Sequence, residues 1–255
     1  KNDDQMPTIG HIGRYALKYK IGAGGLGTVY AAHDPLLSRL IAIKTLNLEI
    51  APEERDAFNA LFLNEARAAG GLSHPHIVTV FDAGVSDQSA YIAMELLKGR
   101  DLRQLRQEGW RPAPMQAAMI VRRVADALAY AHSKGVVHRD IKPANIFITG
   151  RTQPKVLDFG IARVAQQRAS RPSGVDRVDI DPDPSDTSVP SPELGSPYYV
   201  SPEHLRGEQL DARADVYGVG VVLYELLTGH RAFDGETLED IRDAVLEGPV
   251  PPAHI

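Results

Sequence analysis

The chain has 255 residues, of which 43% are apolar and 24% are charged, so it can bury a substantial core in one large domain or two lobes. Its formal net charge of -5 gives no reason to expect a nucleic-acid partner, and the absence of cysteine excludes a disulfide framework and thiolate zinc sites. The longest apolar run, Val216 to Leu227, is too short to span a bilayer.

The first third of the chain is expected to be rich in β-structure. Residues 1–13 are polar and predict a flexible leader. Glycines between Ile21 and Tyr30 predict a turn joining two strands, and the pattern of Leu40 to Leu46 predicts a third strand. Pro52 begins a helix whose first turn is acidic and which is expected to reach Ala69, before two glycines.

The remainder changes from strands to helices. The apolar patterns predict further strands and helices at these positions: strands Ile77 to Phe81, Ala90 to Glu95, Ile146 to Ile148 and Lys155 to Leu157, and helices Asp101 to Gln107, Pro114 to Ser133, Asp211 to Leu227 and Thr237 to Leu246. The segment from Arg163 to Glu193 is rich in Pro, Ser and Asp and is not expected to order itself. A small β-rich half followed by a larger helical half indicates an α+β fold.

The glycines near residue 22 suit a loop that covers phosphates. Gly22-Ala23-Gly24-Gly25-Leu26-Gly27 fits G-x-G-x-x-G, a pattern that also opens dinucleotide-binding folds. In those folds a helix follows the glycines and an acid stands about twenty residues on. Here a strand follows, and the later position holds Lys44, so a glycine hairpin over phosphates is favoured.

Lys44 lies in an otherwise apolar strand and therefore needs an anionic partner, because burying an unpaired ammonium is unfavourable. Nucleotide phosphates and one carboxylate would provide it. Glu65, on the helix that follows, is the expected carboxylate, and a glutamate on the solvated helix face is the alternative.

A second group of polar residues lies in the later half. His138-Arg139-Asp140 is followed by Lys142 and Asn145, a spacing that can orient a hydroxyl, contact a phosphate and hold a metal ion. Asp158-Phe159-Gly160 comes after a predicted strand, and a strand-end acid suits Mg²⁺. His74-Pro75-His76 could also suggest a metal, but a turn with hydrogen-bonded histidines is favoured.

These motifs, taken together and in order, resemble a eukaryotic-type protein kinase domain, and Asp140 to Asn145 resembles its serine/threonine branch. The sequences Pro143 to Ile146 and Asp158 to Arg163 are similar to those of bacterial members of the family. The resemblance implies a bilobal fold with residues 14–97 as the N-lobe and hinge, 98–255 as the C-lobe and 158–203 as the activation segment. The chain ends at Ile255, before the family's last helices, so the C-lobe is expected to be truncated.

The resemblance also implies a role for each motif residue, with ATP and Mg²⁺ as cofactors. Asp140 would accept the substrate hydroxyl proton, Lys142 would neutralise the γ-phosphate, and Lys44, paired with Glu65, would hold the α- and β-phosphates. Asn145 and Asp158 would hold the metal ions. The remaining nucleotide contacts would come from the glycine hairpin, the strand ends and the hinge: Ile21, Gly22, Gly24, Gly27, Val29, Ala42, Met94, Glu95 and Leu97.

The resemblance further implies that kinase activity is regulated through Arg139, which would bind a phosphate carried by the activation segment. The candidate phosphorylation sites in this segment are Ser170, Ser173, Ser185, Thr187, Ser188, Ser191 and Ser196, of which Ser185, Thr187, Ser188 and Ser196 are favoured. Asp215 is expected to brace the catalytic loop from behind. Gly229 to Phe233 departs from the family's Gly-x-x-Pro-Phe element, which is expected to alter only a local turn.

The leading interpretation is thus an active protein serine/threonine kinase that phosphorylates its own activation segment and acts on protein substrates. A kinase-fold scaffold that binds nucleotide without turnover is the alternative, and a small-molecule kinase is a third interpretation. The resemblance to bacterial members further implies a cytoplasmic domain with a membrane anchor outside this chain. A homodimer would follow if it covers the surface left by the absent helices.

Overall fold

The computed structural model describes residues 5–24, 27–46, 50–86, 89–150, 152–161 and 197–254. The chain divides into two compact units, and each is described by itself. The described part of the first unit lies within Lys1–Gly71 and Thr79–Leu97. The described part of the second lies within Leu72–Val78, Lys98–Arg163 and Glu193–Ile255.

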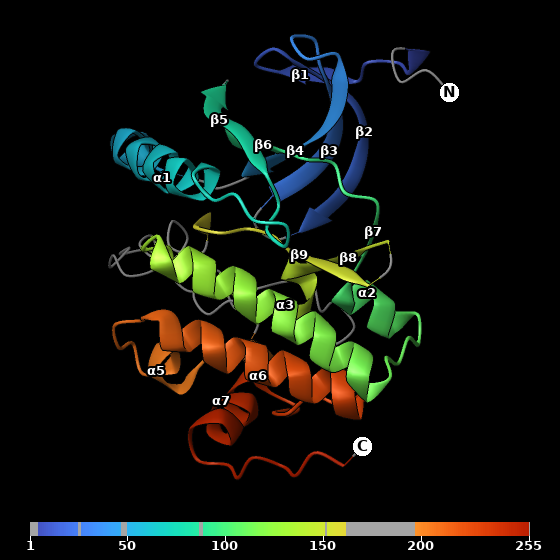
Figure 1. The fold of residues 1–255 in the computed structure, drawn as a ribbon. Coiled ribbons are helices and arrows are strands. Elements are labelled where there is room, and N and C mark those ends of the chain that lie inside the picture. The colour runs from blue at the N-terminus through green and yellow to red at the C-terminus, as the bar shows by residue number, and fades with distance from the viewer. Residues whose placement is uncertain are drawn as a thin grey trace. The chain divides into compact units, whose positions relative to one another are not determined.

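The described residues of the first unit form one six-stranded antiparallel sheet with the order β1-β2-β3-β4-β6-β5 (Figure 1). Its strands are β1 Gly10–Ile12, β2 Tyr15–Gly24, β3 Gly27–Asp34, β4 Arg39–Leu46, β5 Val80–Ser86 and β6 Ser89–Met94. Between β4 and β5 come the 3₁₀ turn η2 (Pro52–Glu54) and helix α1 (Arg55–Gly70), which packs on β5 and β6. The predicted small β-rich lobe is confirmed.

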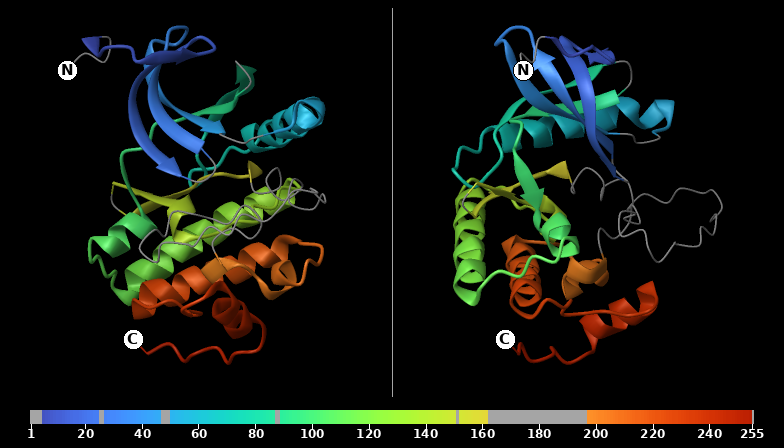
Figure 2. Two further views of the ribbon diagram at one scale, coloured as in Figure 1. Left: turned by 180° about the vertical axis from the view of Figure 1, so that it is seen from behind. Right: turned by 90° about the vertical axis from the view of Figure 1, so that its right-hand side faces the viewer.

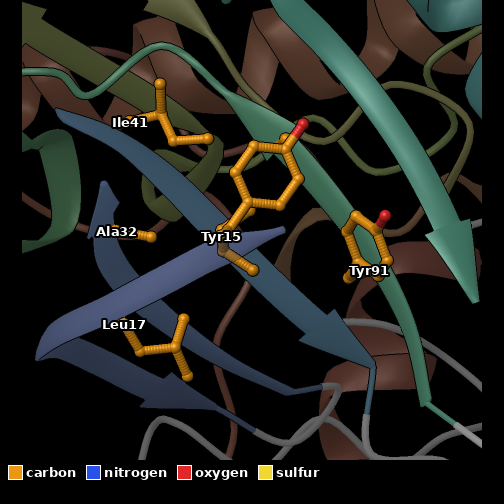
Figure 3. Close-up of a cluster of buried hydrophobic side chains, with 7 residues drawn as sticks. Tyr15, Leu17, Ala32, Ile41 and Tyr91 are labelled. Carbon is orange, nitrogen blue, oxygen red and sulfur yellow. The ribbon is translucent and has the colours of Figure 1, made fainter. Parts of the chain in front are cut away.

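An apolar cluster on this sheet fixes the N-terminal strands. Tyr15 and Leu17 of β2 pack together with Ala32 of β3, Ile41 of β4 and Tyr91 of β6 (Figure 3). Tyr15 is 1% exposed, and its ring meets that of Tyr91 edge to face at 6.1 Å. Burial of this many apolar side chains favours one register of β2 against β3 and of β3 against β4.

The second unit is mostly helical, as predicted. Its elements are β7 Gly99–Asp101, α2 Leu102–Gln107, α3 Pro114–Ser133, η3 Pro143–Asn145, β8 Ile146–Thr149, β9 Gln153–Val156, η4 Pro197–Tyr199, α5 Pro202–Leu205, α6 Ala212–Thr228 and α7 Leu238–Leu246. β7, β8 and β9 form a small antiparallel sheet. Helix α6 lies between α3 and α7 (Figures 1 and 2). Among the described residues, no helix combines the length and apolar character needed to cross a bilayer.

Local sequence signals account for the helix limits. Pro114 begins α3 at a position where the missing amide hydrogen is harmless, and Asp101 and Thr237 cap α2 and α7 through their side chains. Helix α6 begins after the cap residue Asp211 and ends at Thr228, because Gly229 takes a left-handed conformation (φ 72°). These four helices were predicted within one residue of their observed ends.

Two predictions about strands were wrong. Gly10–Ile12, expected within a flexible leader, forms β1 and pairs with Tyr15–Leu17. The strand expected at Ile77 to Phe81 instead begins at Val80. Ile77 and Val78 are buried, and Val78 N donates to Val156 O at 3.0 Å in the second unit. Their apolar character therefore reflects burial in an irregular segment, which an apolar pattern does not distinguish from a strand.

His74 and His76 form hydrogen bonds within the protein, as expected for a turn with hydrogen-bonded histidines. His74 Nε2 lies 3.0 Å from Asp126 Oδ2, and His76 Nδ1 lies 2.9 Å from the carbonyl oxygen of Pro154. Each ring is thus used in an internal hydrogen bond of the second unit.

Tyr217 provides a test of packing in the second unit. Its ring stacks on Phe233 at 6.3 Å, and its buried hydroxyl has no hydrogen-bond partner among the described residues. Burial, with a smaller contribution from Glu203, raises the pKa of Tyr217 to about 12. The phenol of an unfolded chain has a pKa near 10. Its stabilising contribution is therefore complete below about pH 10 and is lost as the pH rises from about 10 to about 12.

We expect Tyr217→Phe to leave the free energy of unfolding at about pH 7 unchanged, or to raise it by up to about 1 kcal/mol, because no hydrogen bond is removed. The variant should also lose less stability than the parent between about pH 10 and 12. Urea unfolding across this range measures both effects. A large loss of stability at neutral pH would show that the hydroxyl has a partner after all.

Candidate active site

The glycine-rich motif forms the hairpin between β2 and β3. Gly22 pairs with Val29, and Gly24 pairs with Gly27. A Cβ atom at Gly27 would overlap the carbonyl oxygen of Thr45, so glycine is required there by packing. A Cβ at Gly22 would meet no protein atom within 4 Å. Packing therefore does not explain a glycine at residue 22, which leaves close approach of a ligand as its predicted role. Gly25 and Leu26 lie outside the described residues.

The neighbouring strands carry the other predicted nucleotide contacts of the first unit. Val29 pairs with Lys44, and Ala42 pairs with Met94. Ala42 and Met94 are buried, whereas Ile21 is 49% exposed. Lys44 is half-buried rather than buried. Apolar side chains beside a half-buried lysine suit the base and the phosphates of a nucleotide.

Glu65 lies on α1 and is half-buried, one residue before the buried Ala66. Helix α1 packs on β5 and β6, and β6 is the direct neighbour of β4, which carries Lys44. Both residues thus belong to the same unit. The ion pair between Lys44 and Glu65 stays a prediction.

The segment after β6 has a defined pattern of backbone hydrogen bonds. Glu95 N donates to Thr79 O at 3.0 Å, and the Glu95 carboxylate accepts from Thr79 N at 2.9 Å. The amide of Glu95 is therefore already occupied. Leu97 makes no backbone hydrogen bond with any residue that the structure describes. Of the amides of Glu95 and Leu97 in the predicted hinge Glu95 to Leu97, that of Leu97 is therefore the one left for the predicted contact with adenine.

In the second unit, His138 organises the predicted catalytic loop. It is fully buried, and its ring packs edge-on against Phe159 at 4.7 Å. Its Nδ1 accepts a hydrogen bond from Asp140 N at 3.1 Å, which leaves the proton on Nε2, facing the carbonyl oxygen of Leu157. One imidazole thus ties the loop to the residue that precedes Asp158.

Asp215, on α6, supports this loop through hydrogen bonds to its backbone, as predicted. One oxygen accepts from His138 N at 2.8 Å and from His132 Nε2 at 2.7 Å, and the other accepts from Arg139 N at 2.8 Å. Arg139 has φ 74°, a conformation that is unfavourable for a residue with a side chain. The two backbone hydrogen bonds to Asp215, which is 1% exposed, hold the loop in this strained conformation.

Asp140, Lys142 and Asn145 come together in the second unit. Lys142 Nζ lies 3.3 Å from Asp140 Oδ2, and the Asp140 side chain is 24% exposed. Asn145 is buried, and its Nδ2 donates to Asp140 O at 2.8 Å. Its Oδ1 is therefore the atom that remains to bind a cation. The grouping offers one carboxylate that is accessible to a hydroxyl and one cation beside it.

Asp158 follows Leu157, whose amide donates to Asn145 O at 2.9 Å. It is half-buried and adopts a left-handed conformation (φ 65°), which points to a backbone held by its surroundings. Among the described residues, no three His, Cys, Asp or Glu side chains form a metal-binding group. One amide oxygen and one carboxylate suit Mg²⁺, which takes few protein ligands and completes its shell with phosphates and water. The donor set therefore fits the predicted metal.

The structure also contains functional contacts that sequence reasoning missed. His132 is in the last turn of α3, where a histidine is ordinarily explained by the helix dipole, so its contact with Asp215 gave no signal. Glu225 lies on α6 and is only 5% exposed; it accepts a hydrogen bond from Tyr199 at 2.6 Å and forms a close ion pair with Arg106. Burial and the Glu225 carboxylate raise the pKa of Tyr199. Ser185, Thr187, Ser188 and Ser196 lie outside the described residues.

We expect Tyr199→Phe to lower the free energy of unfolding by about 1 to 3 kcal/mol, because Glu225 is left buried with one partner fewer. Tyr198→Phe is the matched control, since the Tyr198 hydroxyl forms no hydrogen bond with the described part of the chain. Urea denaturation of both variants measures the difference. Equal midpoints for the two would contradict the role given to the Tyr199 hydroxyl.

Comparison with known proteins finds similarity to protein kinases. The sequence model of the protein kinase domain family matches residues 15–249. A probable serine/threonine-protein kinase of Corynebacterium efficiens is 42% identical over 246 residues, which cover 94% of this chain and 35% of that protein. The serine/threonine-protein kinase PknB of Mycobacterium leprae is 37% identical over 255 residues, covering 98% and 38%.

Among solved structures, a mutant of the PknI kinase domain of Mycobacterium tuberculosis matches with a TM-score of 0.67 and 27% identity. The match covers 94% of this chain and 86% of that one. The chain spans little more than a third of the length of the curated relatives described above.

Proposed function

The chain belongs to the protein kinase domain family, and on that basis we propose that it transfers the γ-phosphate of ATP to serine and threonine hydroxyls of proteins. The observation that carries this proposal is the catalytic loop. Asp140 stands 3.3 Å from Lys142 and is held by Asn145, while Asp215 fixes the two preceding residues. Members of this family generally use ATP and Mg²⁺.

In the proposed reaction the substrate hydroxyl oxygen forms a bond to the γ-phosphorus while the bond from that phosphorus to the β–γ bridging oxygen breaks, releasing ADP. Asp140 accepts the hydroxyl proton, as its accessible carboxylate allows. Lys142 offsets charge on the transferred phosphoryl group, and Lys44 holds the α- and β-phosphates. Asn145 and Asp158 would hold Mg²⁺, which neutralises phosphate charge when bound.

The test is transfer of labelled γ-phosphate to a generic basic protein and to the chain itself in the presence of Mg²⁺. The Asp140→Asn variant serves as the blank. Incorporation that depends on Asp140 and disappears on chelation of Mg²⁺ is the expected result. ATP binding without any transfer, in this chain and in a longer form, would favour a nucleotide-binding scaffold instead.

We further propose that the chain phosphorylates its own activation segment and that Arg139 then binds the added phosphate. Arg139 supports this because its backbone is already held by Asp215, which limits the freedom of the side chain. Intact mass and peptide mapping after incubation with ATP and Mg²⁺ locate the sites, with Ser185, Thr187, Ser188 and Ser196 as the expected ones. Modification confined to residues outside 158–203 would contradict the proposal.

The location and assembly of the whole protein are also proposals. We propose a kinase domain in the cytoplasm, where ATP is available, with a membrane anchor outside this chain, and a homodimer in solution. Fractionation of cells that express the full-length protein and sedimentation of the purified chain test these points separately. A full-length protein found only in the soluble fraction would contradict the proposed membrane anchor.

A further inference from the structure

The second unit holds one arginine whose setting the proposed function does not use. Arg231 follows α6, and its Cζ lies 3.7 Å from the ring centre of Tyr198. Tyr198 belongs to η4, which begins directly after Ser196, and by the resemblance to protein kinases Ser196 matches the hydroxyl residue that stands just before the substrate-binding loop. Val200, which follows η4, and Ala232 and Phe233, which follow Arg231, belong to one apolar cluster. The segments that carry Tyr198 and Arg231 therefore share one core.

The guanidinium of Arg231 has no acidic partner in the described part of the chain. Its Nε is buried without a hydrogen-bond partner there, and no ion pair to Asp or Glu is formed. A stacked arginine is more rigid than one in solvent, and its planar group presents parallel donors that match carboxylate or phosphate oxygens. Arg231 is therefore organised for an anion that these residues do not supply.

The buried acid that contacts Tyr199 is already neutralised. Glu225 pairs with Arg106 and also accepts from Tyr199, and it is only 5% exposed. Tyr199, whose hydroxyl donates to Glu225, is the direct chain neighbour of Tyr198, on whose ring Arg231 stacks. Both oxygens of Glu225 are thus occupied, one by Arg106 and the other by the Tyr199 hydroxyl. A basic substrate residue would find Glu225 already occupied, whereas an acidic one would find Arg231.

We propose that Arg231, supported by the ring of Tyr198, selects protein substrates that carry an anionic side chain near the phosphorylated hydroxyl. The anion is a carboxylate or a phosphate already present on the substrate. This inference rests on the proposed kinase function and specifies its substrate class. Arg231 is a specificity residue and takes no part in the chemical step.

The experiment uses the 255-residue chain and serine peptides of otherwise neutral sequence. Each peptide carries one Asp, Asn, phosphoserine or Arg, moved through the positions around the acceptor. For at least one position we expect kcat/KM to be about 5- to 10-fold higher with Asp than with Asn, a size typical of a partly exposed charge pair. A larger ratio for phosphoserine identifies phosphate as the preferred anion, and an equal or smaller one identifies carboxylate.

Variants at residue 231 then test the contact directly. Arg231→Gln should reduce the Asp:Asn ratio to about 1 and leave transfer to the neutral peptide unchanged. Arg231→Glu should reverse the preference, so that Arg becomes better than Asp at the same position, which a merely structural role would not produce. The wild-type ratio should also decrease as salt rises from about 0.05 M to about 0.5 M.

Arg213→Gln is the matched control, because Arg213 is 86% exposed at the other end of α6, about three turns from Glu225. It should leave the Asp:Asn ratio as in the parent. A ratio that stays unchanged in Arg231→Glu, or falls equally in Arg213→Gln, would overturn the inference while leaving the kinase activity established. Absence of transfer to every peptide and protein would instead reject the proposed function, and this inference with it.

Discussion

Asp140→Asn is expected to reduce kcat for phosphate transfer by about 10²- to 10⁴-fold, the range that a positioned general base contributes. Asparagine has the same shape but cannot accept the hydroxyl proton. The loop should keep its conformation, because Asn145 Nδ2 bonds chiefly to the backbone oxygen of residue 140, at 2.8 Å. Its distance to Asp140 Oδ2 is longer, at 3.4 Å. Stability and ATP binding should therefore be retained.

The measurement is the rate of γ-phosphate transfer at saturating ATP, together with the affinity for an ATP analogue and the urea midpoint. Asp243→Asn, an exposed acid on α7, is the matched control and should behave as the parent. A variant at residue 140 that incorporates as much phosphate as the parent would reject the assignment of Asp140 as the base.

Asp215→Asn is expected to damage both stability and activity. The carboxylate accepts three hydrogen bonds with no exposure to water, and an amide offers only one oxygen, so its NH₂ group must face at least one donor. Leaving such buried groups unpaired should lower the free energy of unfolding by about 2 to 4 kcal/mol. Arg139 would also lose support for its left-handed conformation, which displaces Asp140 from its position.

Urea denaturation and transfer rates of the same preparations distinguish this variant from Asp140→Asn. Both should lose activity, but only Asp215→Asn should lose stability, and Asp243→Asn should lose neither. Normal kcat in a folded Asp215→Asn protein would show that the loop holds its geometry without the carboxylate. In that case the Asp215 carboxylate would contribute to stability and not to activity.

Much of the fold could be predicted because local chemistry fixes it. The limits of α3 follow from Pro114, and those of α6 from Asp211 and Gly229, which act within a few residues of themselves. The early strand β1 could not be predicted, since a segment of only three residues, Gly10 to Ile12, shows no strand pattern by itself and becomes a strand only when β2 offers a partner. Ile77 and Val78 were misjudged because an apolar run reports burial and leaves the backbone conformation open.

The candidate site divides in the same way. Asp140, Lys142, Asn145 and Asp158 were identified from residue type and spacing, because phosphate transfer needs those groups on short loops. Their roles remain predictions that the variants above test. His132 gave no sign of its contact with Asp215, which joins residues far apart in the chain. Likewise, Glu225 and Arg106 look like ordinary charged residues of helices until α6 and α2 are brought together.

The amino-acid sequence by itself determined the family, the order of the β-rich and helical halves, and the set of residues for the chemistry, because motifs and helix signals are local. Only the tertiary structure decided which charges are neutralised and which are not. Glu225 is satisfied by Arg106 and Tyr199, while Arg231 stacks on Tyr198 and pairs with no acid in the described part of the chain. The reason is physical: the availability of a charge depends on burial and on partners distant in sequence, which exist only once the chain has folded.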